Sequence, residues 1–138
     1  MLRIGGYINI IIAIGHIIGL IWAQQMFEVT GIGTEMNELA LTHWSLPYIL
    51  TILVSIVFFI FGLYGLSADE IIRKVPFLKL GIFAIAAIYI VRGIGELIFD
   101  ISRQEADPIA ETIYSLIALS IGFLFLMGGL KKWKLKSK

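Results

Sequence analysis

Four long stretches of the chain carry no charged side chain, and they define the elements that the sequence predicts. Residues 4–27, 39–68, 80–91 and 112–130 contain no Asp, Glu, Lys or Arg. A helix on the surface of a soluble protein keeps a polar stripe along one side, and apolar runs of this length leave none. The pattern therefore predicts an all-α integral membrane protein. It would be a bundle of four transmembrane helices in a single membrane domain, residues 1–138.

The limits of the spans follow from residues that start and stop helices. Thr34 is placed to cap a helix that begins with Glu35, and we expect this helix to run through His43 into the second span. Asp107 and Pro108 supply an N-cap and a first-turn proline for the fourth span. The predicted spans are residues 4–23, 45–66, 77–99 and 108–130.

The segments between and after the spans carry their own signals. Residues 24–44 form an acidic loop, which we expect to be a solvated lid on the outer side of the membrane. The segment from Ser67 to Glu70 has the pattern of a capping box and predicts a short cytoplasmic helix over residues 70–74. The chain ends in a basic cytoplasmic tail, residues 131–138.

Composition agrees with this class of protein and narrows its chemistry. Of the 138 residues, 59% are hydrophobic and 15% are charged, whereas soluble domains carry about 25% charged residues. The chain has no cysteine, which excludes disulfides, thiolate metal sites and cysteine nucleophiles. Four spans also leave no room for a soluble catalytic domain. The net charge of +1 gives no sign of nucleic-acid binding.

Most basic residues fall on one side of the predicted bundle. The positive-inside rule places such a side in the cytoplasm. Both termini are therefore expected to be cytoplasmic, in a bacterial-type plasma (inner) membrane, with the acidic loop outside. A bias this strong argues against an antiparallel dimer. The basic residues on the expected cytoplasmic side are Arg3, Arg73, Lys74, Lys79, Lys131, Lys132, Lys134, Lys136 and Lys138, whereas Arg103 lies opposite.

Several polar side chains fall inside the predicted spans. By helix rise, Arg92 and His16 each lie about 10 Å inside the outer boundary, and Glu96 follows Arg92 one turn later on the same helix face. An arginine facing lipid at this depth costs a few kcal/mol, so this face should turn inward. We expect an outward-facing intramembrane pocket with an aromatic floor, and exposure of Arg92 and Glu96 on the lipid face would overturn this hypothesis. Its expected ligand-binding residues are His16, Thr51, Arg92, Glu96, Glu111 and Ser115.

The same residues also have purely structural explanations. Arg92 and Glu96 are four residues apart and can form an ion pair within one helix. His16 can make a hydrogen bond between helices, or it can relay a proton with Glu96. The sequence leaves both alternatives open.

Metal and cofactor sites have weaker support, and no cofactor is predicted. Two histidines on neighbouring helices can ligate haem, but His43 lies about 10–15 Å higher than His16 along the bundle, so haem is not expected. His43 and Glu28 in the outer loop are weak candidates for a divalent metal, because no recognisable ligand spacing joins them. Catalytic residues are not identified by any motif.

These observations predict a small membrane protein that binds a small polar or amphiphilic ligand in the outward-facing pocket. The sequence leaves open whether the protein also transports this ligand. One alternative is a parallel homo-oligomeric pore or scaffold, in which the same residues line the contact between subunits. Another is a membrane-embedded enzyme that acts on a lipid or quinone-like substrate, which rests on the clustering of acid–base groups. The expected partners are the lipid bilayer and a small-molecule or lipid ligand, and no nucleic acid.

Overall fold

The chain folds into helices, and four of them are long. The computed structural model describes the backbone of residues 1–102 and 108–134 and the side chains of residues 1–98 and 112–134. No strand occurs in this part of the chain, and the four long helices are apolar and long enough to cross a membrane. They support the predicted four-span membrane protein. The long helices are α1 (Leu2–Gly19), α4 (Leu46–Ala68), α5 (Leu78–Ser102) and α6 (Pro108–Lys134).

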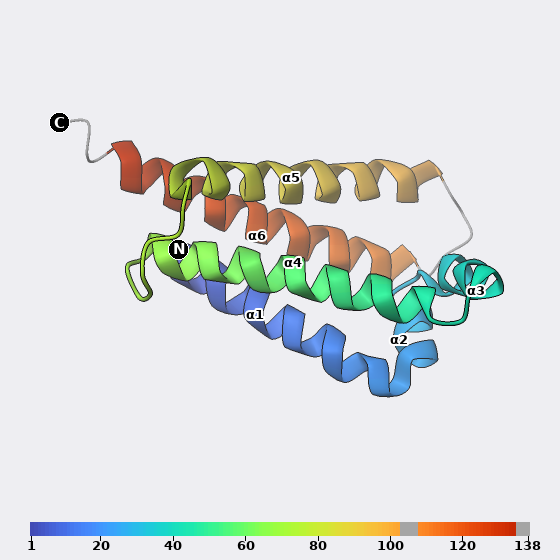
Figure 1. Cartoon of the computed structure of the whole chain (residues 1–138). Coiled ribbons are helices and arrows are strands. Elements are labelled where there is room, and N and C mark those ends of the chain that lie inside the picture. The colour runs from blue at the N-terminus through green and yellow to red at the C-terminus, as the bar shows by residue number, and fades with distance from the viewer. Residues whose placement is uncertain (103–107, 135–138) are drawn as a thin grey trace.

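The long helices associate as two pairs. Helix α1 packs along α4 and α5 packs along α6, while the two pairs touch each other less extensively (Figure 1). Glycines allow the close approach within each pair: a Cβ atom on Gly65 of α4 would lie 2.7 Å from the Cα atom of Gly6 on α1. Likewise, a Cβ atom on Gly93 of α5 would lie 2.7 Å from Cγ of Leu119 on α6. Small residues are typical of tight helix contacts in membranes.

A shared apolar core joins the two pairs, mainly in the half of the bundle that contains the N-terminus. The fully buried ring of Phe125 on α6 lies over Gly5 of α1, where a Cβ atom would come within 2.7 Å of it. Leu2 packs on Gly128 in the same way. The buried members of this core are Leu2, Ala68, Ile82, Ile85, Ala86, Tyr89, Ala118, Ile121 and Phe125.

At the other end of the bundle, the predicted loop 24–44 is largely helical. A short 3-10 helix, η1 (Leu20–Trp22), leads from α1 into α2 (Ala23–Val29), which packs against α3 (Gly33–Thr42). A small separate cluster of Ala23, Phe27 and Met36 holds this cap together.

The prediction that one helix runs through His43 into the second span is wrong. His43 is extended, with φ −160° and ψ 129°, and it separates α3 from α4. Pro47 stands in the first turn of α4, where its missing N–H does no harm; inside a continuous helix it would remove a backbone hydrogen bond. The break therefore falls just before the proline.

The predicted short helix over residues 70–74 is also absent, because α4 continues to Ala68 and Ser67 is still inside it. Ser67 therefore cannot act as an N-cap. Its hydroxyl instead donates to the carbonyl of Arg73 and accepts from the N–H of Val75, both at 3.0 Å. Glu70, with φ 64°, begins the irregular connection that these bonds hold.

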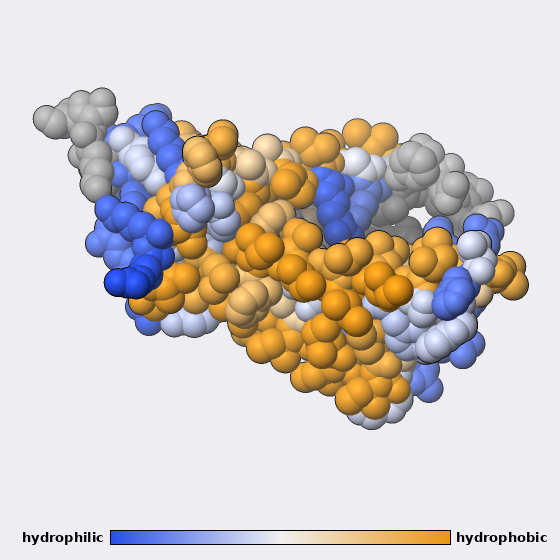
Figure 2. Space-filling model, in the orientation of Figure 1, coloured by the Kyte–Doolittle hydropathy of each residue, from blue (hydrophilic) through white to orange (hydrophobic). Residues whose placement is uncertain are grey.

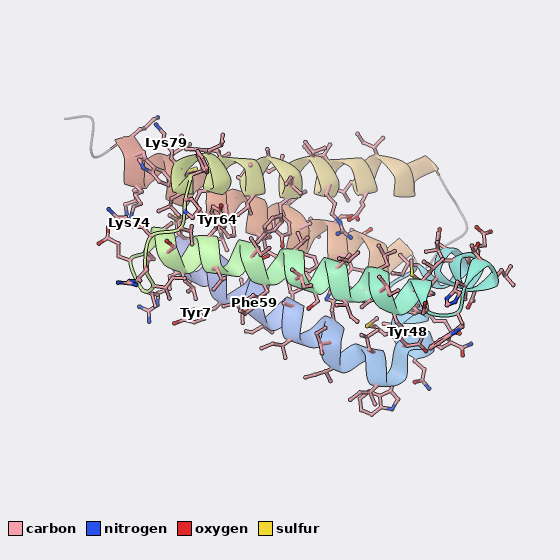
Figure 3. All side chains as sticks on the ribbon, in the orientation of Figure 1. Tyr7, Tyr48, Phe59, Tyr64, Lys74 and Lys79 are labelled. Carbon is pink, nitrogen blue, oxygen red and sulfur yellow. The ribbon has the colours of Figure 1, made fainter. Side chains whose placement is uncertain are left out.

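The two ends of the bundle differ in charge. We call the end with the N-terminus and the connection between α4 and α5 the basic end; Lys74 and Lys79 lie there, close to Tyr64 (Figure 3). The opposite end, covered by α2 and α3, is the acidic end, with Tyr48 near it. Between them the visible surface is mostly apolar (Figure 2). The acidic residues described on α2 and α3 are Glu28, Glu35 and Glu38.

Candidate functional site

The candidate site centres on an ion pair within the apolar part of α5. Nε of Arg92 donates to Oε1 of Glu96 at 2.7 Å, so the two side chains pair within one helix. The Arg92 side chain is 56% exposed and that of Glu96 is 36% exposed. The bundle therefore does not enclose the pair, in contrast to the expectation that this face would turn inward.

The pair leaves the donors of Arg92 largely unused. A guanidinium group has five N–H donors, and the Nε–H is the one that bonds to protein among the residues that the structure describes. Glu96 is more fully occupied, because its second oxygen lies 3.5 Å from the hydroxyl of Ser115 on α6, a long hydrogen bond. Ser115 itself is completely buried. The carboxylate is therefore held towards α6, while the terminal nitrogens of Arg92 remain available.

Helices α4 and α5 diverge towards the acidic end, along the part of α5 that contains Arg92 (Figure 1). Near the basic end the two helices touch, and a Cβ atom on Gly81 would overlap the ring of Tyr64. Further along, the ring centroid of Tyr89 is still 6.0 Å from that of Phe61 on α4. A Cβ atom on Gly95 would meet nothing within 4 Å.

Gly81, Arg92 and Gly95 lie near one face of α5 by helical spacing, so this face passes from contact to open space. We call the space beside Arg92, Gly95 and Glu96 the α4–α5 opening. Figure 2 shows a hydrophilic patch where α5 faces α4, with apolar surface next to it on the side of α4 and towards the basic end. Apart from Lys79 at the basic end, Arg92 and Glu96 are the charged residues among the described side chains of α5.

A buried hydrogen bond forms the floor of this opening. The hydroxyl of Tyr89 donates to Oδ1 of Asn9 on α1 at 2.5 Å, and both side chains are buried. Asn9 in turn donates from Nδ2 to the carbonyl of Gly5 at 2.8 Å. Tyr89 was not among the site residues predicted from the sequence. A tyrosine in mid-span needs a partner for its hydroxyl, and its position one turn before Arg92 was the signal that could have found it.

His16 lies apart from the ion pair. Its Nδ1 donates to the carbonyl of Ile12 at 2.8 Å, and its ring centroid is 5.2 Å from that of Phe58 on α4. Phe58 is in turn 6.4 Å from the ring of Tyr89, so its ring contacts both. The structure shows no hydrogen bond or ion pair between His16 and Arg92 or Glu96, which are all described.

Thr51 is used for packing within the α1–α4 pair. Its hydroxyl donates to the carbonyl of Pro47 at 2.8 Å, on its own helix, and the side chain is buried. One turn further, the hydroxyl of Ser55 crosses to the carbonyl of Ala13 on α1 at 2.8 Å. Of the predicted ligand-binding residues, the structure therefore brings together Arg92, Glu96 and Ser115. The side chain of Glu111 lies outside the described residues.

The weak metal candidates do not converge. Among the described residues no three His, Cys, Asp or Glu side chains come together. Nδ1 of His43 lies 2.7 Å from the hydroxyl of Ser45, and its ring stacks on Trp44. Glu28 instead lines a shallow hollow of about 430 Å³ at the turn between α1 and α2, with Trp22 and Gln25 among its neighbours.

Comparison of the chain with protein-family models, with curated proteins and with solved structures finds no match in any of the three.

Proposed function

We propose that this protein binds a small amphiphilic ligand at Arg92, in the α4–α5 opening. The single observation that carries the proposal is the state of Arg92, which is half exposed in the apolar part of the bundle with most of its donors unused. Unsatisfied donors in hydrocarbon cost several kcal/mol each. A ligand with a polar group supplies the missing partner, and its apolar part covers the surface around it.

The surroundings of Arg92 fit a binding site of this kind. Ligand sites are mostly apolar, with a few polar groups that fix orientation. Here the half-buried ring of Phe58 and the buried Tyr89 form an apolar base. The ion pair with Glu96 holds the guanidinium at one position, which reduces the ordering cost on binding.

For the orientation in the cell, we propose that both termini are cytoplasmic and that the protein resides in a bacterial-type plasma membrane. The charge difference between the two ends supports this, because Lys and Arg are retained on the cytoplasmic side. The α4–α5 opening would then lie in the outer half of the bilayer.

The first test is retention of ligand during purification, followed by native mass spectrometry of the protein released from detergent. We expect the wild-type protein to carry a non-protein mass that is lost in Arg92→Gln and kept in Lys79→Gln. Lys79 is a matched control, because it is an exposed cation on the same helix but at the basic end. Equal retention in both variants would place the ligand elsewhere and refute the proposal.

A parallel homo-oligomer is a second candidate, favoured by the open space at Gly95. A helix of another copy could approach there, because a side chain on Gly95 meets no atom of this chain. Gly95→Trp would then block assembly, whereas a protein that is already monomeric stays monomeric with this substitution. The number of copies in the native mass spectrum distinguishes the two candidates.

A further inference from the structure

We infer that the ligand is an anionic amphiphile of the bilayer, whose carboxylate or phosphate group takes the free donors of Arg92. Its hydrocarbon chain lies in the α4–α5 opening. This inference rests on the proposed function and adds the charge of the ligand and its route into the site.

The sign of the charge follows from which groups of the ion pair are already occupied. Both oxygens of Glu96 have donors, Nε of Arg92 on one and the hydroxyl of Ser115 on the other. The terminal nitrogens of Arg92 have no partner among the described residues. A cationic ligand would have to compete for an occupied carboxylate beside a positive charge. An anion meets free donors.

The geometry of the free donors selects the type of anion. The two terminal nitrogens of a guanidinium lie in one plane and match two oxygens of a carboxylate or a phosphate. A charge-assisted hydrogen bond is stronger at a site from which water is excluded. The apolar surroundings of Arg92 therefore favour an anionic group that brings its own hydrophobic cover.

The surface next to Arg92 can accommodate the hydrocarbon chain of a lipid that points towards the bilayer centre. One turn towards the basic end, Ile88 is 51% exposed on the same face of α5, and the ring of Phe58 on α4 lies 6.4 Å from that of the neighbouring Tyr89. In the other direction, the sequence after Glu96 stays apolar over residues 97–99 and next carries a charge at Asp100, about 12 Å along the helix from Arg92. A lipid in the leaflet next to the acidic end has its headgroup nearer to that end and its hydrocarbon chain towards the bilayer centre. Arg92 and the apolar surface at Ile88 follow each other in the same direction.

The cap at the acidic end favours a lateral route. Helices α2 and α3 lie at this end over α4 and α6 (Figure 1), and the hydroxyl of Tyr114 on α6 reaches the carbonyl of Val29 on α2 at 3.4 Å. The side of the bundle between α4 and α5 is open at Gly95. A ligand that is dissolved in the bilayer therefore reaches Arg92 without crossing the cap.

The inference is tested by titrating the purified protein and counting bound molecules by native mass spectrometry. Oleate presents a carboxylate and oleoyl-lysophosphatidate a phosphate, and oleyl alcohol is the neutral match. Oleoyl-lysophosphatidylcholine is the zwitterionic match, and acetate and inorganic phosphate carry the charge without a chain. We expect at least one anionic amphiphile to bind about tenfold tighter than oleyl alcohol. A difference in affinity of this size corresponds to at least one charge-assisted hydrogen bond.

The outcomes separate this inference from the proposed function. Equal binding of neutral, zwitterionic and anionic amphiphiles at Arg92 overturns the inference and leaves amphiphile binding intact. Binding of no amphiphile overturns both. Acetate or phosphate binding as tightly as oleate or oleoyl-lysophosphatidate shows that the chain contributes nothing, and this also overturns the inference. The stronger of the two anionic amphiphiles identifies the headgroup chemistry.

Two substitutions with opposite expected signs exclude a merely structural effect. Arg92→Gln should weaken binding of the anionic amphiphile about tenfold, whereas Glu96→Gln should strengthen it severalfold. Replacement of the Glu96 carboxylate by a neutral amide eliminates its repulsion of the anion, while the amide oxygen still accepts from Nε of Arg92. Arg92→Lys keeps the charge without the planar fork and should lose affinity partially. It serves as the second variant if Arg92→Gln does not fold. Lys79→Gln should change nothing, and weakening in Glu96→Gln overturns the inference.

Discussion

Tyr89 of α5 donates a 2.5 Å hydrogen bond to the side chain of Asn9 on α1, and this bond joins the two helix pairs inside the bundle. On one side of it, towards the basic end, the pairs share a core that includes the fully buried Phe125. On the other side, Arg92 and Glu96 are exposed. The Asn9–Tyr89 bond therefore marks the level at which packing between the pairs gives way to the α4–α5 opening.

We expect Tyr89→Phe to destabilise the bundle by about 1–2 kcal/mol, because the side-chain oxygen Oδ1 of Asn9 loses its hydrogen-bond donor in an apolar core. Unfolding in mixed detergent micelles, followed by circular dichroism, measures the change. Tyr7→Phe is the matched control, because Tyr7 is exposed and its ring lies beneath Arg3 at 5.9 Å. An equal loss in both variants would mean that the buried hydrogen bond contributes nothing.

The glycine contacts within the α1–α4 pair predict that alanine substitutions at Gly65 and Gly95 differ in their effect on stability. A Cβ atom on Gly65 would meet backbone atoms of Gly6, which cannot move aside as a side chain can. We expect Gly65→Ala to force α1 and α4 apart and to cost about 1–3 kcal/mol. Gly95→Ala has open space and should be neutral within about 0.5 kcal/mol. The same unfolding assay compares them, and a loss in Gly95→Ala alone would contradict this packing.

Lys132 links the connection between α4 and α5 to the end of α6. Its Nζ donates to the carbonyl of Ala68, at the C-terminus of α4, and lies 3.2 Å from Oε1 of Glu70. A cation at a helix C-terminus stabilises the helix by about 0.3–1 kcal/mol. Lys132→Met should therefore leave the fold intact and accelerate hydrogen exchange of the backbone over residues 69–76. Lys131→Met, which removes an exposed neighbouring cation, should leave the exchange unchanged, and equal acceleration in both would refute the link.

The proposed orientation can be tested by cysteine labelling, because the chain contains no cysteine of its own. Glu38 on α3 and Lys131 on α6 are exposed at opposite ends. A membrane-impermeant maleimide should label Glu38→Cys in intact spheroplasts and Lys131→Cys only after the membrane is broken. The reverse pattern would invert the orientation and place the α4–α5 opening in the inner half of the bilayer.

The helices were predictable from the sequence where a single local property decides them. Charge-free runs define the four long helices, and Pro108 begins α6 as expected. The errors fall where two local signals compete. The capping pattern at Ser67 was wrong because α4 continues through it. The helix expected to begin with Glu35 behind a Thr34 cap instead begins at Gly33, and it ends at Thr42, before Pro47.

The candidate site was only partly predictable. Spacing alone places Arg92 beside Glu96, and the structure has this ion pair. Which faces of other helices meet it depends on how the helices rotate and cross. Ser115 reaches Glu96, whereas His16 and Thr51 bond to their own helices. Hydroxyl and imidazole groups can be satisfied by a carbonyl one turn away, so their place in a span does not assign them to a shared pocket.

The sequence by itself determined that the chain forms four apolar helices and that Arg92 and Glu96 lie within one of them, because hydropathy and helical spacing are local properties. Only the tertiary structure decided that the helices form two pairs and that the pairs part beyond Tyr89. That arrangement depends on contacts between distant residues, such as Gly6 with Gly65 and Asn9 with Tyr89. Whether a charged pair is enclosed or exposed is a property of helix packing, which no single helix encodes.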